Sequence, residues 1–370
     1  MTSLHRPRRI FSDTESRQER HARRRAISQT HWAREHTINQ PADFSDVAPA
    51  DRMRLLQQYG DFSLAYSTAV QPLLKHYGDA SGYIAYRQRL GVTIALGDPV
   101  VADQHRAAFL AGFIAKFRRP VFCQVSRCTA EVLNANHYRV NELGVDTSLP
   151  LAEYSLAGKE KEWLRYAANW VQRRGYRIVE ADFNSIDVDR IEAISEAWRK
   201  TRTVKTKEVR FLNRPIVLEP EASVRRFFLQ DAAGTMQAFV FFDPLFRHGK
   251  ICGYVTSFKR RHPDAPPAAE QAIMKVAIER MKAEGVGEIR LGLSPFAGIE
   301  DRQFDRSWFT ANLFRWLFSS KMINRWAYHL SGHAEYKRRF RGVEEQTYFA
   351  CRTQFSGRPL AALIGLCGIA

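Results

Sequence analysis

Residues 83–125 read YIAYRQRLGVTIALGDPVVADQHRAAFLAGFIAKFRRPVFCQV, and this stretch decides the fold class. Two β-rich runs at 83–86 and 92–96 are joined by a polar turn, which predicts a β-hairpin. The apolar spacing over 101–117 predicts a helix that ends before Pro120. The VFCQV run that follows predicts another strand. The local order is therefore hairpin, helix, strand.

The same order returns later in the chain. Residues 235–258, TMQAFVFFDPLFRHGKICGYVTSF, again predict strand, polar connection, strand. Helical spacing follows over 268–283, and GEIRLGL at 287–293 predicts the next strand. Two occurrences are too few to stack as a solenoid, so we predict two copies of one α/β unit. A helix is predicted between them within 154–176, where apolar residues share one face.

The two ends of the chain differ in character. Residues 1–45 contain nine arginines and almost no apolar periodicity, which predicts a mobile basic arm. This arm is either a solvated tail or an electrostatic tether for phosphates of RNA or lipid. The apolar run PLAALIGLCGIA at 359–370 is too short to span a bilayer. We expect it to pack on the protein in preference to entering a membrane surface.

Composition narrows the class of partner. Lys and Arg number 56 against 39 Asp and Glu, and the formal charge of +17 favours a polyanion such as RNA or an anionic membrane. Five cysteines without a CxxC pair indicate a reduced cytoplasmic protein and no zinc site. The start of the sequence has no apolar segment after its arginines, so no export signal is predicted. No apolar run reaches transmembrane length.

Five blocks of sequence carry a family resemblance. They are AYRQRLGVTIALGDPV (85–100), PVFCQV (120–125), YSLAGKEKEWLRYAANWVQRRGY (154–176), EIRLGLSPFAG (288–298) and EYKRRF (335–340). In this order they resemble the synthase domain of the phosphatidylglycerol lysyltransferases (multiple peptide resistance factor), the DUF2156 type. The resemblance covers about residues 55–350. It implies an α+β protein with two tandem GNAT-like acyltransferase folds, each with a mostly antiparallel central sheet flanked by helices.

The resemblance also implies a function. The family uses aminoacyl-tRNA as donor and esterifies a membrane lipid such as phosphatidylglycerol, so the expected partners are aminoacyl-tRNA and an anionic phospholipid, with no cofactor and no metal. We expect a cytoplasmic protein that is peripheral at the inner face of the membrane. Full-length members carry a transmembrane flippase region that this sequence does not contain, so we expect lipid modification without lipid translocation. Gln271 stands where the family is expected to have an acidic residue.

Domain boundaries follow from the resemblance and the composition. The predicted parts are the basic arm at 1–45, the first acetyltransferase-like domain at 46–185, the second at 186–350 and the apolar tail at 351–370. The sequence does not indicate an oligomeric state.

The ALGDPV segment carries the first group of candidate residues. Gly97 permits close backbone approach, and Asp98 could orient an incoming amine or accept a proton. The alternative is an ordinary turn in which Asp98 hydrogen-bonds its own backbone, and both interpretations stay open. Arg87 and Gln124 lie in matching blocks and are assigned with Gly97 to substrate binding.

The GKEKEWLR segment supplies a second group. Lys159 and Lys161 lie near the start of a predicted helix, and Arg165 follows Lys161 at i+4, so we expect the last two to share a face. This face could grip phosphates, or it could be a solvated surface. Asn169 continues it and could donate a hydrogen bond to a substrate oxygen.

A third group lies in HAEYKRRFRG. Lys337 stands where the family has a lysine in its substrate cleft, and a lysine near an ester carbonyl can stabilise an oxyanion. Arg339 is assigned to substrate binding; the alternative for the whole segment is a basic surface loop. Ser294, in the SPFAG turn, could help shape the donor channel or belong to a connector. We predict Lys337 and Asp98 as catalytic.

Two other classes of function compete with aminoacyl transfer. Acyl-CoA acyltransferases cradle pyrophosphate with an R/Q-x-x-G-x-G/A turn, and the nearest match here, residues 172–177, ends in Arg. This departure counts against coenzyme A. A non-catalytic RNA or membrane binding protein would also explain the charge, although no RRM or KH signature is present.

Overall fold

The computed structural model describes residues 46–201, 210–300, 303–320 and 330–368, so the basic arm predicted at 1–45 lies outside the described residues. The strands are β1 (Lys75–Asp79), β2 (Gly82–Arg89), β3 (Val92–Leu96), β4 (Val100–Val101), β5 (Val121–Val125), β6 (Arg139–Pro150), β7 (Arg177–Glu180), β8 (Arg225–Gln230), β9 (Met236–Arg247), β10 (Lys250–Arg261), β11 (Glu288–Pro295) and β12 (Val343–Cys351). The helices are α2 (Pro49–Tyr59), α3 (Ala65–Val70), α4 (Arg106–Lys116), α5 (Arg127–Ala135), α6 (Glu162–Arg173), α7 (Val188–Lys200), α8 (Ala269–Ala283), α9 (Trp308–Ser319), α11 (Leu330–Arg338) and α12 (Gly357–Cys367). A 3-10 turn, η2 (Lys159–Lys161), precedes α6.

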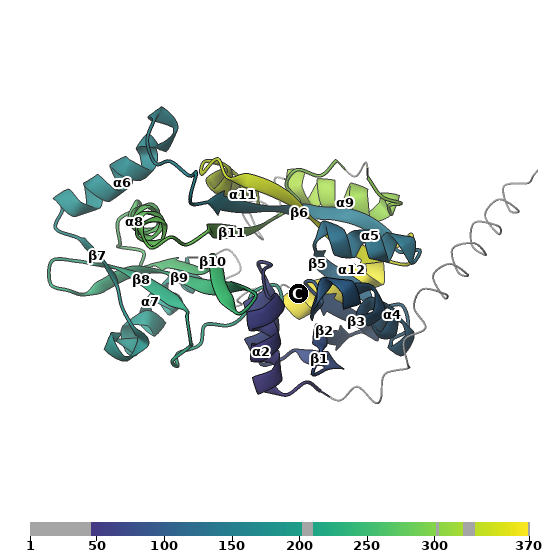
Figure 1. Cartoon of the computed structure of the whole chain (residues 1–370). Helices are drawn as coiled ribbons and strands as arrows, with labels where there is room; N and C mark the ends of the chain where they lie inside the picture. The colour runs from purple at the N-terminus through teal and green to yellow at the C-terminus, as the bar shows by residue number, and fades with distance from the viewer. Residues whose placement is uncertain (1–45, 202–209, 301–302, 321–329, 369–370) are drawn as a thin grey trace, which may run out of the picture. The chain divides into compact units, whose positions relative to one another are not determined.

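One sheet runs through the described chain from Asp46 onward, which belongs to a single compact unit. Its strand order is β1-β2-β3-β5-β12-β6-β11-β10-β9-β8-β7, and β4 pairs with β2 (Figure 1). Two pairs, β3–β5 and β10–β11, are parallel, and the other pairs are antiparallel. The predicted α+β class with a mostly antiparallel sheet is therefore confirmed.

Each parallel pair belongs to one of two similar repeats. The first repeat contains the β2–β3 hairpin, α4, β5, α5 and β6; the second contains the β9–β10 hairpin, α8, β11, α9, α11 and β12. A parallel pair needs a crossover between its strands, and α4 and α8 supply it. The hairpins, helices and strands predicted from local sequence patterns all form, with bounds shifted by a few residues.

The strongest apolar run in the chain is buried on both faces of the sheet. Along β9, Ala238, Val240 and Phe242 belong to the core beneath α8, whereas Phe239 and Phe241 belong to the core on the α7 side. Successive side chains of a strand point to opposite faces, so an unbroken apolar run fits a strand covered twice. Figure 1 shows α8 and α7 on opposite sides of these strands.

The two repeats exchange their last strands. β6 of the first repeat pairs with β11 of the second, and β12 of the second repeat pairs with β5 of the first. β6 and β12 also pair with each other, from Val343 opposite Ser148 to Cys351 opposite Arg139. Neither repeat therefore completes its own sheet.

The segment before residue 185 contributes to the second repeat. α6 packs against α8, and β7 pairs with β8. Leu164, Ala167 and Val171 on α6 share a core with Ile273 and the other apolar residues of α8. The boundary at residue 185 stays a prediction.

The apolar tail forms helix α12. Leu360, Leu363 and Leu366 are buried, and the helix lies on β2 and β3. The expectation that the tail packs on the protein is thus confirmed. None of the helices in the described part of the chain combines the length and the apolar composition that crossing a bilayer requires.

Candidate active site where β10 and β11 separate

β10 and β11 pair in parallel from Gly253 opposite Glu288 to Val255 opposite Arg290, and then separate. We call this point the second splay. β11 bulges here, because its pairing with β6 shifts register between Arg290 and Leu293. Gly292 has φ +77°, a left-handed conformation that favours glycine. The bulge places two consecutive carbonyl groups where a side chain from α11 reaches them.

That side chain is Lys337. Its Nζ donates to the carbonyl oxygens of Gly292 and Leu293, each at 2.7 Å. The residue is buried, and burial lowers the pKa of Lys337 to about 7, with the positive charge of Lys259 acting in the same direction and Asp146 opposing both. At neutral pH this amine can therefore lose or carry a proton.

Asp146 is the carboxylate of this site. It lies on β6 opposite Leu293 and is buried, which raises its pKa, while the nearby Ser63 hydroxyl and the charges of Arg290 and Lys337 partly offset the rise. Its Oδ1 makes no hydrogen bond to any described residue. A buried polar atom without a partner is uncommon, and it marks a place where a ligand could bind.

Ser294 belongs to the same place. It is buried on β11, directly after Leu293, and lies opposite Val145 of β6. Lys337 and Asp146 thus meet at Leu293, whereas the Ser294 side chain, one residue further along the strand, points to the opposite face of the sheet from Asp146. Substrate contact by Ser294 stays a prediction.

Asp98, Gly97 and Gln124 lie at the corresponding point of the first repeat. β3 and β5 pair in parallel up to Leu96 opposite Cys123, and Gly97 follows with φ +71°. We call this point the first splay. Gln124 is buried with φ +58°, at a bulge between β5 and β12.

The groups of the first splay already have partners. Asp98 accepts a hydrogen bond from the Ser126 N–H at 2.9 Å and lies 3.9 Å from Arg106. The ring of Phe62 lies against Gly97, only 2.8 Å from where a Cβ would be. Asp98 therefore holds the start of α5, 28 residues away, and not the backbone of its own turn; its catalytic role stays a prediction. β5 and β11 are separated by β12 and β6, or about 14 Å across the sheet, so the structure does not bring Asp98 next to Lys337.

The GKEKEWLR segment contradicts one expectation. Lys161 and Arg165 do not share a solvent face, because Lys161 lies in η2 with its Nζ buried against the Tyr154 hydroxyl at 3.0 Å and the Phe340 carbonyl. Arg165 is half-buried and donates to the Leu156 carbonyl at 2.5 Å. The desolvated amine of Lys161 thus ties α6 to the end of α11.

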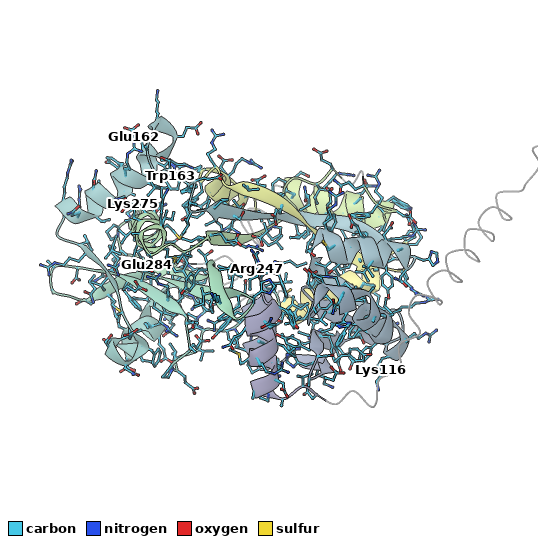
Figure 2. All side chains as sticks on the ribbon, viewed as in Figure 1. Lys116, Glu162, Trp163, Arg247, Lys275 and Glu284 are labelled. Atoms are coloured by element: carbon cyan, nitrogen blue, oxygen red, sulfur yellow. The ribbon has the colours of Figure 1, made fainter. Side chains whose placement is uncertain are left out.

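The GKEKEWLR and HAEYKRRFRG segments nevertheless meet around the contact between Lys161 and Phe340. The Arg339 guanidinium lies 4.2 Å from the centre of the Trp163 ring, and Arg341 pairs with Glu160 at 3.2 Å. Figure 2 labels Trp163 on the first turn of α6. We call the exposed side of this contact, which carries Lys159 and Arg339, the junction surface; Asn169 is exposed further along α6. The segments that form it are about 175 residues apart in the chain.

Arg87 lies elsewhere, on β2 opposite Ile94. Burial lowers its pKa, and the positive charges of Arg210 and Arg89 lower it further. It is therefore part of a cluster of like charges beside β2 and not part of the second splay.

A family comparison now adds to this geometry. The family model described as "Phosphatidylglycerol lysyltransferase, C-terminal" matches residues 53–351, which include both splays and the junction surface. The chain belongs to this family. The match stops before α12, whose residues begin at Gly357.

Individual relatives agree with this assignment. The phosphatidylglycerol lysyltransferase of Bacillus subtilis strain 168 is 23% identical over 267 residues, which are 70% of this chain and 30% of the relative. The lysylphosphatidylglycerol biosynthesis bifunctional protein LysX of Nocardia farcinica is 28% identical over 127 residues, 32% of this chain and 11% of the relative. The chain thus matches less than a third of the length of these curated relatives.

Two solved structures share the fold. L-PGS from Bacillus licheniformis superposes with a TM-score of 0.70 at 18% identity and covers 89% of this chain and 99% of that one. The C-terminal DUF2156 domain of an Agrobacterium fabrum protein gives 0.69 at 17% identity, with 87% and 99% covered. At this identity the likeness supports the fold alone.

Asp146 is a candidate site residue that the sequence patterns did not predict. It lies in the β-rich run LGVDTSLP, which carries no motif, and its position beside Lys337 depends on pairing between β6 and β11. The strand itself gave little signal, because it also carries Glu142, Thr147 and Ser148. Among the described residues, no group of three or more His, Cys, Asp or Glu side chains is placed to hold a metal.

Proposed function

We propose that this chain transfers an aminoacyl group from aminoacyl-tRNA to a hydroxyl of a membrane lipid such as phosphatidylglycerol. The observation that carries the proposal is the Lys337 amine, which is buried at the second splay, held by two carbonyl groups and adjacent to Asp146. The family match supports the choice of reaction, because it covers this site.

The position of Lys337 supports a simple transfer. A neutral amine has two N–H groups and one lone pair; if both N–H groups stay on the carbonyls of Gly292 and Leu293, the lone pair can take the proton of the acceptor hydroxyl. The acceptor oxygen forms a new ester bond to the aminoacyl carbon, and the bond to the tRNA ribose oxygen breaks. The proton then passes from Lys337 to that ribose oxygen. The ammonium formed in between stabilises the oxyanion.

Asp146 complements this step. Its buried oxygen without a partner can accept a hydrogen bond from the α-ammonium group of the aminoacyl donor. An ammonium ion bound here would lower the pKa of Asp146, since an opposite charge favours the ionised carboxylate. The ester is already activated, so the reaction asks mainly for positioning and needs no further cofactor.

The junction surface is the proposed contact for tRNA. Arg339 and Lys159 are exposed beside the end of α11, the helix that carries Lys337. Basic side chains next to a reactive site can hold the phosphates of an acceptor end by charge, and the Trp163 ring offers a stacking surface. Residues 172–177, the nearest match to the coenzyme A turn, span the end of α6 and the turn after it, where Gly175 has φ +81°.

The test uses the full chain and its substrates. Purified protein would be incubated with detergent-dispersed phosphatidylglycerol and each aminoacyl-tRNA in turn, beginning with lysyl-tRNA, and the lipids analysed by mass spectrometry. An aminoacylated lipid that depends on charged tRNA is expected. Formation of an acylated product from acetyl-CoA, with none from any aminoacyl-tRNA, would contradict the proposal.

A further inference from the structure

Exposed apolar side chains gather beside helix α12. Phe355, just before the helix, is 66% exposed, and its ring centre lies 5.7 Å from that of Trp308, which is 52% exposed. Leu90, at the end of the β2 strand, is 56% exposed, and Ile364 of α12 is 41% exposed. We call these four residues the apolar rim. Arg358 joins its parts, since its side chain donates to the Leu90 carbonyl at 2.6 and 2.9 Å.

The core does not require this rim. α12 already buries Leu360, Leu363 and Leu366 against β2 and β3. Its opposite face, which carries Arg358 and Ile364, is exposed. Several large apolar side chains exposed around one helix, with polar groups between them, are typical of a surface that meets a partner.

Charge indicates what kind of partner this is. The described segments that build the surface, 82–97, 306–320, 330–334 and 351–368, contain no Asp or Glu. Arg89 packs against α12, with its Nε 2.3 Å from where a Cβ on Gly365 would be, and the backbone N–H of Arg210 donates to the Cys367 carbonyl at 3.0 Å. Together with Arg87 these arginines form a like-charge cluster beside the rim. An apolar rim with unbalanced positive charge fits an anionic lipid surface.

We infer that the apolar rim is the surface by which this protein docks on an anionic phospholipid bilayer, with Trp308 and Phe355 at the depth of the headgroups and the arginines on lipid phosphates. Trp favours this depth, the apolar Phe ring can insert from it toward the acyl chains, and guanidinium groups bind phosphate well. The inference deepens the proposed function, on which it rests for the lipid acceptor. It also adds an element that the family match does not include, because α12 lies beyond residue 351.

The experiment compares vesicle binding of matched variants. The full chain would be floated with vesicles of equal parts phosphatidylglycerol and phosphatidylcholine, and with phosphatidylcholine alone. The double variant Trp308→Ser, Phe355→Ser is expected to bind the anionic vesicles about tenfold or more weakly, because two apolar side chains no longer leave water. The control, Leu73→Ser with Tyr166→Ser, removes two apolar side chains that are equally exposed and lie outside the rim, and should bind as the wild type.

The basic arm at 1–45 is retained in all variants, so any binding by charge alone is common to them. Raising the salt concentration should weaken binding of every variant and should not remove the difference between the double variant and its control. Circular dichroism and melting temperature establish that both variants fold. Equal vesicle binding by the folded double variant and the control would overturn the inference.

A second measurement separates docking from catalysis. With detergent-dispersed phosphatidylglycerol the double variant should transfer at the wild-type rate, and with vesicles it should lose activity in proportion to binding. If no lipid is aminoacylated in either format but vesicle binding still requires Trp308 and Phe355, the proposed function fails and the docking surface stands. A dimer that depends on Trp308 and Phe355, together with vesicle binding that does not, would overturn the docking surface and assign the rim to a second copy of the chain.

Discussion

The first and second splays have the same backbone plan and opposite chemistry. In both, a parallel pair of strands joined by a helix separates beside a bulge. At the first splay Phe62 fills the space against Gly97, and Asp98 is held by Ser126 and Arg106. At the second, a lysine and an aspartate are buried without a closed set of partners.

This difference distinguishes a structural position from a candidate functional one. Burying an ionisable group costs free energy unless it is paired, so such groups are expected at positions that use them. The first splay removes this cost by completing its hydrogen bonds, and it links the first repeat together. At the second splay the free-energy cost of burial remains, and the same burial lowers the pKa of Lys337 and raises that of Asp146.

The largest expected effect is on Lys337. Lys337→Met should lower kcat for aminoacyl transfer by about 100-fold or more, since it removes the group that moves the proton and stabilises the oxyanion. Single-turnover measurements of lipid product would give this rate. Lys116→Met, at the exposed end of α4 and labelled in Figure 2, is the matched control. A folded Lys337→Met protein with near wild-type kcat would remove the difference between the splays.

Asp98→Ala is expected to do the opposite at the first splay. It leaves the Ser126 N–H without its acceptor and the partly buried Arg106 with Asp103 as its carboxylate, which should lower the free energy of unfolding by about 2 kcal/mol. Urea unfolding would measure this loss. Because Asp98 lies away from Lys337, kcat per folded molecule should stay within about twofold of wild type. A large fall in kcat without loss of stability would restore Asp98 as a catalytic residue.

The pH dependence of stability should identify Lys337. Its pKa is about 7 in the folded protein against an ordinary value of 10.5, so between these pH values the unfolded chain binds one more proton than the folded protein. Stability therefore rises with pH across this window, and the penalty of burying the ammonium is complete below it. The free energy of unfolding of the wild type, measured relative to that of Lys337→Met, should therefore increase as the pH rises from about 7 to 10.5. A difference independent of pH would contradict the lowered pKa.

The pH dependence of the transfer rate tests the protonation state of Lys337 independently. If neutral Lys337 accepts the proton, kcat should rise as pH increases through about 7 and then level off. A rate that falls over the same range would assign Lys337 only the role of an ammonium that stabilises the oxyanion.

The smallest expected effect concerns the junction surface. Arg339→Ala should raise the KM for aminoacyl-tRNA by about three- to tenfold and flatten its salt dependence, with kcat changed less. Arg118→Ala, an exposed arginine after α4 in the first repeat, is the control. Equal KM values and salt slopes for the two variants would leave the junction surface as an ordinary solvated face.

Sequence reasoning succeeded where structure depends on neighbours in the chain. The hairpin at 83–96 and the helix at 268–283 follow from turn residues and apolar spacing, which act locally. The exchange of β6 and β12 could not be predicted in this way, because the sequences RVNELGVDTSLP and VEEQTYFAC carry no pattern that selects one partner strand. Pairing across the sheet decided between them.

The candidate site shows the same division. Lys337 was found through its family motif, whereas Asp146 was missed because only the pairing of β6 with β11 brings it there. The orientation of Lys161 was wrong for a related reason, since its partner Phe340 is 179 residues away. Local spacing places a side chain on a helix or turn but does not reveal which distant carbonyl it will meet.

The exchanged strands also bear on how the protein is made. β12 occupies the middle of the sheet, between β5 and β6, yet it follows every other strand in order of synthesis. On the ribosome, β5 and β6 therefore wait with open edges until residue 351 has emerged. Open edges invite pairing with other chains, so the period before β12 inserts is when the nascent chain most needs protection from aggregation. Closure by a strand so distant in sequence is also expected to make folding slow.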